Sequence, residues 1–188
     1  INRIDIHKKP SWVNSAVFYQ IFPERFCNGN PKLSPENVAP WGTAPDRQIF
    51  MGGDLPGITQ KLSYLEELGV NALYLTPIFE ATSNHKYDTV DFYRVDAHLG
   101  SNEQLAELTS SLHQRGMRIV LDAVVDHTSD QHPWFTAASD VHATARRFYT
   151  FDEKGQHIGW KGLSHLPKLD FASREVQEIV YSGDDAIL

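Results

Sequence analysis

The chain of 188 residues is 41% hydrophobic and 22% charged, and it carries a formal net charge of −7. This composition is typical of a soluble globular protein, and the acidic balance argues against nucleic acid or an anionic membrane as a partner. No apolar run approaches the roughly 20 residues of a membrane span. The first nine residues lack the apolar core of a signal peptide and Cys27 is the single cysteine, so we expect a cytoplasmic protein without internal disulfides.

The first half of the chain predicts two strands with a helix between them. Residues 1–15 form a lead-in that Pro10 interrupts, and the aromatic and β-branched run at 16–22 predicts a first strand. Residues 27–49 are rich in Gly, Pro and Asn, which indicates a long irregular loop. Apolar residues at helical spacing then predict a helix over 58–68 that Gly69 ends, and a second strand follows at 70–75.

The second half continues this alternation and then departs from it. Residues 80–96 predict a polar loop, and Ser101 with Gln104 resembles a capping box before an amphipathic helix that Gly116 ends. The apolar run after Gly116 predicts a third strand that is buried on both faces. Residues 129–171 contain seven aromatic residues without clear periodicity and predict an insertion, and a last helix is expected near Ser173.

Strands that alternate with helices predict a parallel sheet. Three strands neither close a barrel nor protect such a sheet. We therefore expect the first part of a larger α/β domain, whose open sheet edge is covered by another copy or by further chain.

Polar residues follow the second and third strands, at the edge where parallel α/β sheets bind ligands. Asp122 and His127 fit two interpretations equally well: an orienting pair in a site, or a strand-end turn beside a histidine bonded to backbone. Tyr87 can stack on a sugar ring or pack one loop against another, and the two roles are compatible.

Motifs for metals and cofactors are sparse. Asn28, Asn30, Gly52 and Asp54 offer oxygens of the kind that Ca²⁺ binds, but their spacing matches no EF-hand, and the residues alone favour turn formation. No phosphate-binding glycine loop and no GxSxG elbow occur, so we expect no organic cofactor. Five histidines fit no common zinc motif: His127, His132, His142, His157 and His165.

Five stretches, in order along the chain, together resemble the α-amylase family of glycoside hydrolases. They are AVFYQIFPERF at 16–26, GGDLPGI at 52–58, NALYLTPIFEATSNHKYDTVDF at 71–92, LDAVVDH at 121–127 and LPKLDF at 166–171. The last is similar to the MPKLN motif of the cyclomaltodextrinase, neopullulanase and maltogenic amylase branch.

The resemblance implies an α/β fold that is the N-terminal part of a (β/α)₈ TIM barrel (strands 1–3), with domain B inserted after strand 3. It divides the chain into a lead-in linker at 1–15, three β/α units at 16–128, domain B at 129–171 and the start of a barrel helix at 172–188. It implies retaining hydrolysis of α-1,4 or α-1,6 bonds in cyclodextrins, pullulan or maltooligosaccharides. The expected partners are an oligosaccharide substrate and, in the complete protein, further copies of the same chain.

The resemblance also implies roles for individual residues. Tyr87 matches the tyrosine that stacks under the sugar at the cleavage point. His127 matches the histidine that hydrogen-bonds the hydroxyls of that sugar, and Asp122 matches the strand-three aspartate that helps order the site. The positions of a calcium site reported in this branch are matched by Asn28, Asn30, Gly52 and Asp54.

Several positions depart from the family pattern. The family nucleophile lies on strand four in an RxD-type motif and the acid is a Glu on strand five. Neither motif occurs here, so we expect both residues beyond Leu188 and expect the 188-residue chain to be inactive. Asp126 and Asp170 stand where the family usually has asparagine, and Ser34 stands near where further acidic calcium ligands are expected.

Other functions are compatible with part of this pattern. A transglycosylase of the same family shares these motifs, and a non-catalytic carbohydrate-binding module would retain the sugar-facing residues. An unrelated doubly wound binding protein explains none of the ordered stretches.

Overall fold

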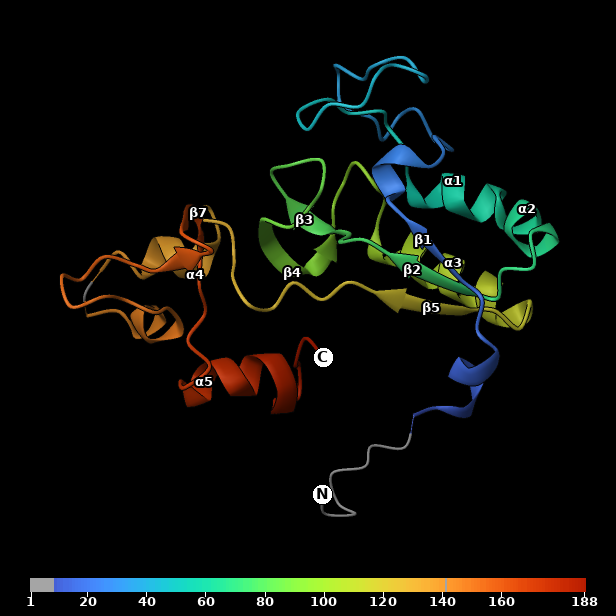
Figure 1. Ribbon diagram of the computed structural model, residues 1–188. Coiled ribbons are helices and arrows are strands. Elements are labelled where there is room, and N and C mark those ends of the chain that lie inside the picture. The colour runs from blue at the N-terminus through green and yellow to red at the C-terminus, as the bar shows by residue number, and fades with distance from the viewer. Residues whose placement is uncertain (1–8, 141) are drawn as a thin grey trace.

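The computed structural model describes residues 9–140 and 142–188. At its centre is a parallel sheet of order β1-β2-β5, formed by Phe18–Ile21, Ala72–Leu75 and Arg118–Leu121 (Figure 1). The register pairs Ile21 with Leu75 and Leu75 with Leu121, so the carboxyl ends of the three strands meet at one edge. The prediction of a parallel sheet is confirmed, and each strand is shorter than its apolar run. The first eight residues of the predicted lead-in lie outside the described residues, and its remainder contains a 3-10 helix at Ser11–Ser15.

The helix predicted at 58–68 is divided into α1 (Leu55–Gln60) and α2 (Leu62–Glu67). It begins earlier than predicted because Asp54 caps α1, with its Oδ1 accepting from the Gly57 N–H at 2.6 Å. Gly69 adopts a φ of +78° and donates to Glu66 O, which ends α2 as predicted. The next helix, α3 (Asn102–Gln114), begins at Ser101, whose Oγ accepts from the Gln104 N–H at 3.3 Å. This bond is the N-cap half of the predicted capping box.

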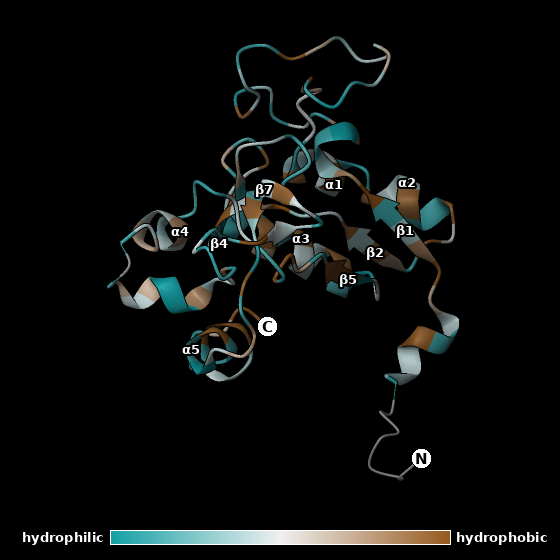
Figure 2. Ribbon diagram, turned by 60° about the vertical axis from the view of Figure 1, so that its left-hand side comes forward, coloured by the Kyte–Doolittle hydropathy of each residue, from teal (hydrophilic) through white to brown (hydrophobic). Residues whose placement is uncertain are grey.

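One apolar core joins these helices to the sheet. Leucines from the helices and β2 are fully buried in it, and each contributes about 2 kcal/mol by burial. In Figure 2 α2 carries both hydrophobic and hydrophilic residues, as expected of a helix with one face on a core. The members of this core include Ile21, Leu55, Ile58, Leu62, Leu65, Leu73, Leu75, Leu108 and Leu112.

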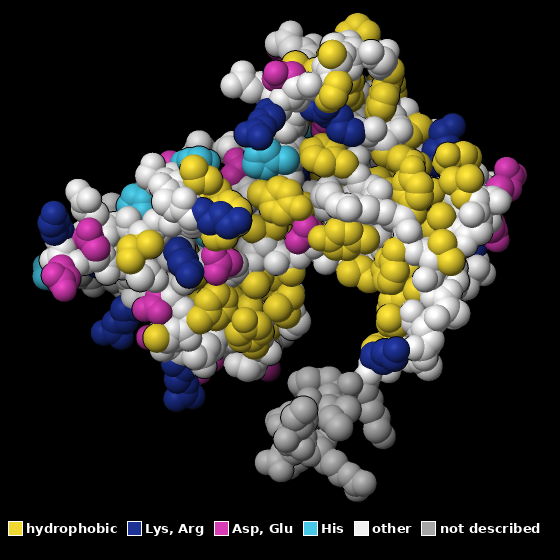
Figure 3. Space-filling view, in the orientation of Figure 1, with side chains coloured by type: hydrophobic (Ala, Val, Ile, Leu, Met, Phe, Trp, Pro, Cys, Tyr) yellow, Lys and Arg dark blue, Asp and Glu magenta, His cyan; other side chains and the backbone are white. Residues whose placement is uncertain are grey.

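The prediction that the third strand is buried on both faces is wrong. Ile119, Val120 and Leu121 of β5 are only half-buried. In the described structure β5 lies at an edge of the sheet, whereas β2 lies between two strands and has three of its four residues buried. Val17 and Phe18, at the start of β1, are about half exposed. Figure 3 shows hydrophobic side chains gathered on this face of the molecule, in the region of the sheet.

The prediction of a polar loop at 80–96 is also wrong in part, because this stretch contains most of an antiparallel hairpin. Its strands are β3 (Phe79–Ala81) and β4 (Thr89–Val95). The β-branched and aromatic residues of β4 favour a strand, but the polar residues between them conceal its apolar pattern. Only residues 82–88 form the loop itself.

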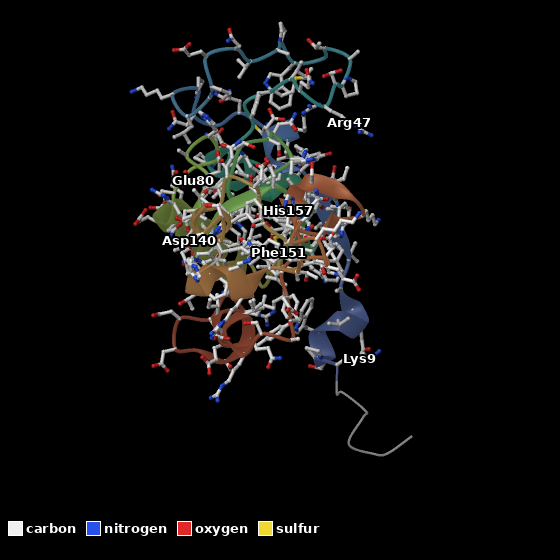
Figure 4. All side chains as sticks on the ribbon, turned by 90° about the vertical axis from the view of Figure 1, so that its left-hand side faces the viewer. Lys9, Arg47, Glu80, Asp140, Phe151 and His157 are labelled. Atoms are coloured by element: carbon white, nitrogen blue, oxygen red, sulfur yellow. The ribbon has the colours of Figure 1, made fainter. Side chains whose placement is uncertain are left out.

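The predicted insertion shares a small second core with the last helix, in which Ala138, Tyr149 and Leu169 pack with Val176 and Val180. It contains α4 (Pro133–Ala137), a 3-10 helix at Thr144–Phe148 and a hairpin of β6 (Gly159–Trp160) and β7 (Leu163–Pro167). Figure 4 shows Phe151 and His157, whose backbones form an antiparallel bridge. The last helix, α5 (Arg174–Gln177), starts after Ser173 as predicted and continues as a π-helical turn at Glu178–Ser182. In the described part of the chain, no helix is long and apolar enough to cross a membrane.

Candidate active site

A cavity of about 1140 Å³ opens beyond the carboxyl ends of the three parallel strands. Its walls come from the loop after β1, the 82–88 loop between β3 and β4, the segment after β5 and the β6–β7 hairpin with the residues beside it. Four aromatic side chains and three histidines lie in these walls, and the aromatic rings suit the apolar faces of sugar rings. The lining residues include Phe22, Arg25, Trp41, His85, Tyr87, His127, Trp160 and His165.

The long loop after β1 is held by two residues that follow the strand. The buried carboxylate of Glu24 accepts from the Gly52 N–H at 2.9 Å and from the Met51 N–H. Arg25 donates to the carbonyl oxygens of Asp46 (2.7 Å) and Ile49 (2.9 Å). The loop therefore forms a wall of the cavity without regular secondary structure. Figure 4 shows Arg47 on this loop.

Asp122 is the centre of a hydrogen-bonded group that reaches the cavity through Tyr87. It follows β5 directly, and its Oδ2 accepts from the hydroxyls of Tyr74 (2.7 Å) and Tyr87 (2.9 Å). Burial, and next the bond to Asp122, raise the pKa of Tyr87 to about 12. The bond to Asp122 is the main cause that raises the pKa of Tyr74. Both phenols therefore stay protonated and donate to the carboxylate at neutral pH.

His127 meets Tyr87 rather than Asp122. Its Nε2 lies 3.0 Å from the Tyr87 carbonyl oxygen, which can only accept, so Nε2 carries the proton. Its Nδ1 is buried without a hydrogen-bond partner among the described residues, and Asp126 Oδ2 lies 3.9 Å away. Burial lowers the pKa of His127, which keeps the imidazole neutral. The interpretation of Asp122 and His127 as a direct pair is wrong, because each contacts a different part of Tyr87.

The LPKLDF stretch places His127. Leu169 N donates to Asp126 O at 2.9 Å, and Thr128 N donates to Pro167 O at 3.1 Å. His127 and Lys168 form an antiparallel bridge between these bonds. The end of the insertion is thus tied to the segment that follows β5, which explains why two distant stretches act as one site.

The residues matched to a calcium site lie close together. The Asp54 carboxylate accepts from the N–H groups of Gly29 (2.9 Å) and Asn30 (2.8 Å), and a Cβ at Gly52 would touch the Asn28 amide. Asn28 Oδ1 is buried and has no partner among the described residues. An unpartnered buried amide oxygen fits a hard cation. The Asp54 carboxylate and Asn30 Oδ1 already accept backbone N–H groups, which weakens them as calcium ligands.

The five histidines considered for zinc do not all share the same surroundings. In the described part of the chain, no group of three or more His, Cys, Asp or Glu side chains is arranged to hold a metal ion. His132 is instead buried and caps α4, with Nδ1 accepting from the Trp134 N–H at 3.1 Å. His127 and His165 line the cavity.

Three aromatic residues of the site escaped the sequence analysis. Tyr74 was part of an apolar strand, although a tyrosine one residue before the strand end is a signal that its hydroxyl meets the site. Trp41 and Trp160 line the cavity from irregular loop and insertion. The ring of Trp160 lies 5.3 Å from that of His127. Only the folded chain brings these segments to one place.

Comparisons with known proteins agree with this geometry. Residues 20–179 match the model of the α-amylase catalytic domain. The chain is 46% identical over 187 residues to the intracellular maltogenic amylase of Bacillus subtilis (strain 168), covering 95% of this chain and 32% of that protein. It is 48% identical over 168 residues to a cyclomaltodextrinase of a Bacillus species, covering 89% and 28%. The chain thus spans about a third of the length of these curated relatives.

A solved structure has the same fold. The cyclic α-maltosyl-(1→6)-maltose hydrolase of Arthrobacter globiformis, in complex with cyclic α-maltosyl-(1→6)-maltose, superposes with a TM-score of 0.85 at 41% identity. The match covers 90% of this chain and 40% of that chain. Strands β1, β2 and β5 are accordingly the first three strands of a TIM barrel, and the segment after β5 carries the insertion. The chain belongs to the α-amylase family, in the branch of cyclomaltodextrinases, neopullulanases and maltogenic amylases.

Proposed function

We propose that the complete protein is a retaining α-glucan hydrolase that cleaves α-1,4 or α-1,6 bonds of cyclodextrins, pullulan or maltooligosaccharides. The observation that carries the proposal is the Tyr74–Asp122–Tyr87 hydrogen-bonded group, whose Tyr87 lines a cavity together with three other aromatic side chains. A relative is named for hydrolysis of a cyclic maltosyl-maltose, which is an α-glucan of this class.

In this proposal Tyr87 presents its ring face to one sugar. The hydroxyl is fixed by Asp122, so the ring cannot rotate away when the site is empty, and little side-chain entropy is lost on binding. Tyr87 is 38% exposed and lines the cavity. Asp122 orders the site by accepting from two phenols at its Oδ2.

His127 has a positioning role before any sugar binds. Its Nε2–H already donates to the Tyr87 carbonyl, so a bond to a sugar hydroxyl requires that Nε2–H to be shared or exchanged. Direct contact between His127 and the substrate stays a prediction. A neutral imidazole suits either role, because a hydroxyl can donate to it or accept from it.

The bond-breaking carboxylates are expected on barrel strands four and five, outside the 188 residues. The complete protein should therefore hydrolyse β-cyclodextrin, pullulan or maltotriose, and the 188-residue chain should not. The test is turnover of these three substrates by both proteins, with NMR of the first product anomer. The α-anomer supports retention, the β-anomer contradicts it, and turnover by the short chain contradicts the placement of the carboxylates.

The same assay separates the alternatives. Longer maltooligosaccharides formed from maltotriose identify a transglycosylase. Quenching of tryptophan fluorescence by maltotriose without turnover by the complete protein identifies a carbohydrate-binding module. A cytoplasmic location and a homo-oligomeric complete protein stay predictions, the first supported by the name of the intracellular relative.

We also propose that Asn28, Asn30, Gly52 and Asp54 hold a calcium ion weakly. The buried unpartnered oxygen of Asn28 supports this site. The ion would supply structural closure of the loop rather than chemistry. Calorimetric titration of the EDTA-treated protein with CaCl₂ tests it, with Asn28→Leu as the control; no binding heat up to 10 mM refutes the site.

A further inference from the structure

Lys86 combines two features that are both rare. Its side chain is 2% exposed, and its backbone adopts a left-handed φ of +64°. Lysine is almost never fully buried unless it is paired, and a residue with a Cβ seldom adopts positive φ outside a constrained loop. Such outliers concentrate at functional sites. Lys86 directly precedes Tyr87.

A buried ion pair compensates for the burial of the lysine charge. Lys86 Nζ lies 2.6 Å from Asp96 Oδ2, and the side chains of Lys86 and Asp96 are 2% and 5% exposed. Asp96 is itself fixed, since its Oδ1 accepts from the His98 N–H at 2.9 Å and its backbone N–H donates to Ile78 O at 2.9 Å. Lys86 Nζ also lies 5.8 Å from the centre of the Phe50 ring. The Lys86 side chain is therefore held between Phe50 of the long loop and Asp96, which follows β4.

The rest of the 82–88 loop is built around Asp88. Its carboxylate accepts from the hydroxyls of Thr82 and Ser83 and from the Ser83 N–H. His85 Nδ1 accepts from the Tyr87 N–H at 3.1 Å. Within this frame, Lys86 sends its side chain into the core and the next residue sends its ring into the cavity. The backbone is left-handed at the residue where this reversal occurs.

We propose that Lys86 is a positioning residue for sugar binding: its buried pair with Asp96 holds the left-handed turn that aims the Tyr87 ring into the cavity. This inference rests on the proposed function only for the sugar; the orientation of Tyr87 can be measured without it. Lys86 touches no substrate in this scheme and acts through Tyr87.

The test compares Lys86→Met, Tyr87→Ala and their double variant in the complete protein. Because Lys86 acts through Tyr87, Lys86→Met should lower kcat/KM for maltotriose at least tenfold. The double variant should lose no more than Tyr87→Ala alone. Lys86→Arg, which retains the charge, should recover most of the activity. Lys154→Met is the control, because Lys154 is an exposed lysine of the insertion that does not line the cavity; it should change kcat/KM less than twofold.

A second readout is independent of turnover. NMR titration of ¹³C-labelled tyrosine should show that Lys86→Met lowers the pKa of Tyr87 from its raised value, because the ring leaves Asp122. If Lys86→Met does not fold, the double variant Lys86→Met/Asp96→Asn is used in its place, because it leaves no unpaired buried charge. An unchanged Tyr87 titration, or multiplicative losses in the double variant, overturns the inference. Absence of turnover in the wild-type protein with a shifted titration overturns only the proposed function.

Discussion

Asp54 is the residue on which the long loop and the first barrel helix both depend. It is fully buried, and its carboxylate accepts three backbone N–H groups, from Gly57 at 2.6 Å, Gly29 at 2.9 Å and Asn30 at 2.8 Å. Asp54→Ala would leave all three donors without this acceptor. Each costs about 1–2 kcal/mol when water cannot fully replace the carboxylate, so the total is about 4 kcal/mol. That is a large share of the roughly 5–15 kcal/mol that stabilises a typical protein.

Two measurements test this on the complete protein. Urea unfolding gives the stability, and hydrogen exchange, read by mass spectrometry of peptides from residues 26–60, gives the local protection. We expect the unfolding midpoint to fall and protection to be lost first at Gly29 and Asn30. The unfolding midpoint of Asp54→Asn should lie between those of the wild type and Asp54→Ala. The asparagine keeps one acceptor oxygen, but it turns an amide N–H₂ toward the remaining donors.

Asp152→Ala is the matched control. Asp152 also accepts two backbone N–H groups, from Lys154 at 2.9 Å and Gln156 at 2.8 Å, but it is exposed. Water can replace its carboxylate, so the loss should stay below about 1 kcal/mol. If Asp54→Ala costs no more than Asp152→Ala, burial of the acceptor does not determine the stability of this loop, and the reasoning fails.

Three further predictions concern titration, the site and packing. Burial lowers the pKa of His132 to about 4, below its ordinary 6.5, so its contribution to stability is complete above pH 6.5 and is lost as the pH falls toward 4. The free energy of unfolding should change by about 3 kcal/mol over this range. His132→Asn should flatten the dependence of that free energy on pH between 4 and 7, whereas the exposed control His113→Asn should not. Equal pH dependence in both variants would contradict this. Asp122→Asn should lower the pKa of Tyr87 from about 12, although not below 10 because burial remains, and should reduce kcat/KM about tenfold; an unchanged tyrosine titration would refute the role of the bond. Gly57→Ala should cost more than about 2 kcal/mol, because its Cβ would overlap Cys27 O, whereas Gly69→Ala, which points into open space at positive φ, should cost about 1 kcal/mol; thermal unfolding that ranks them in reverse would contradict the packing.

Local chemistry determined much of the barrel portion. Gly69 and Ser101 mark helix ends because left-handed backbone and an N-cap oxygen are properties of single residues. The alternation of strand and helix required parallel strands, since a crossover helix returns the chain in the same direction. Ordered motifs then identified the family before any contact was known.

Local chemistry also misled where polar and apolar residues mix. The hairpin of β3 and β4 was interpreted as loop, because its polar residues obscure the β-branched pattern of Thr89–Val95. Burial of β5 was predicted from its apolar run alone. Exposure depends instead on how many neighbours a strand has, and β5 has one in the described sheet.

Only the tertiary structure decided which groups of the site meet. Asp122 contacts hydroxyls from Tyr74 and Tyr87, which lie 48 and 35 positions away, and His127 contacts a backbone carbonyl 40 positions away. Sequence determined that these residues stand at strand ends, because that follows from periodicity along the chain. Their pairing depends on the register β2–β5 and on the left-handed turn at Lys86, which are set by packing between distant segments. No local sequence pattern records this packing between distant segments. Residues of the site could therefore be named from the sequence, but their hydrogen bonds could not.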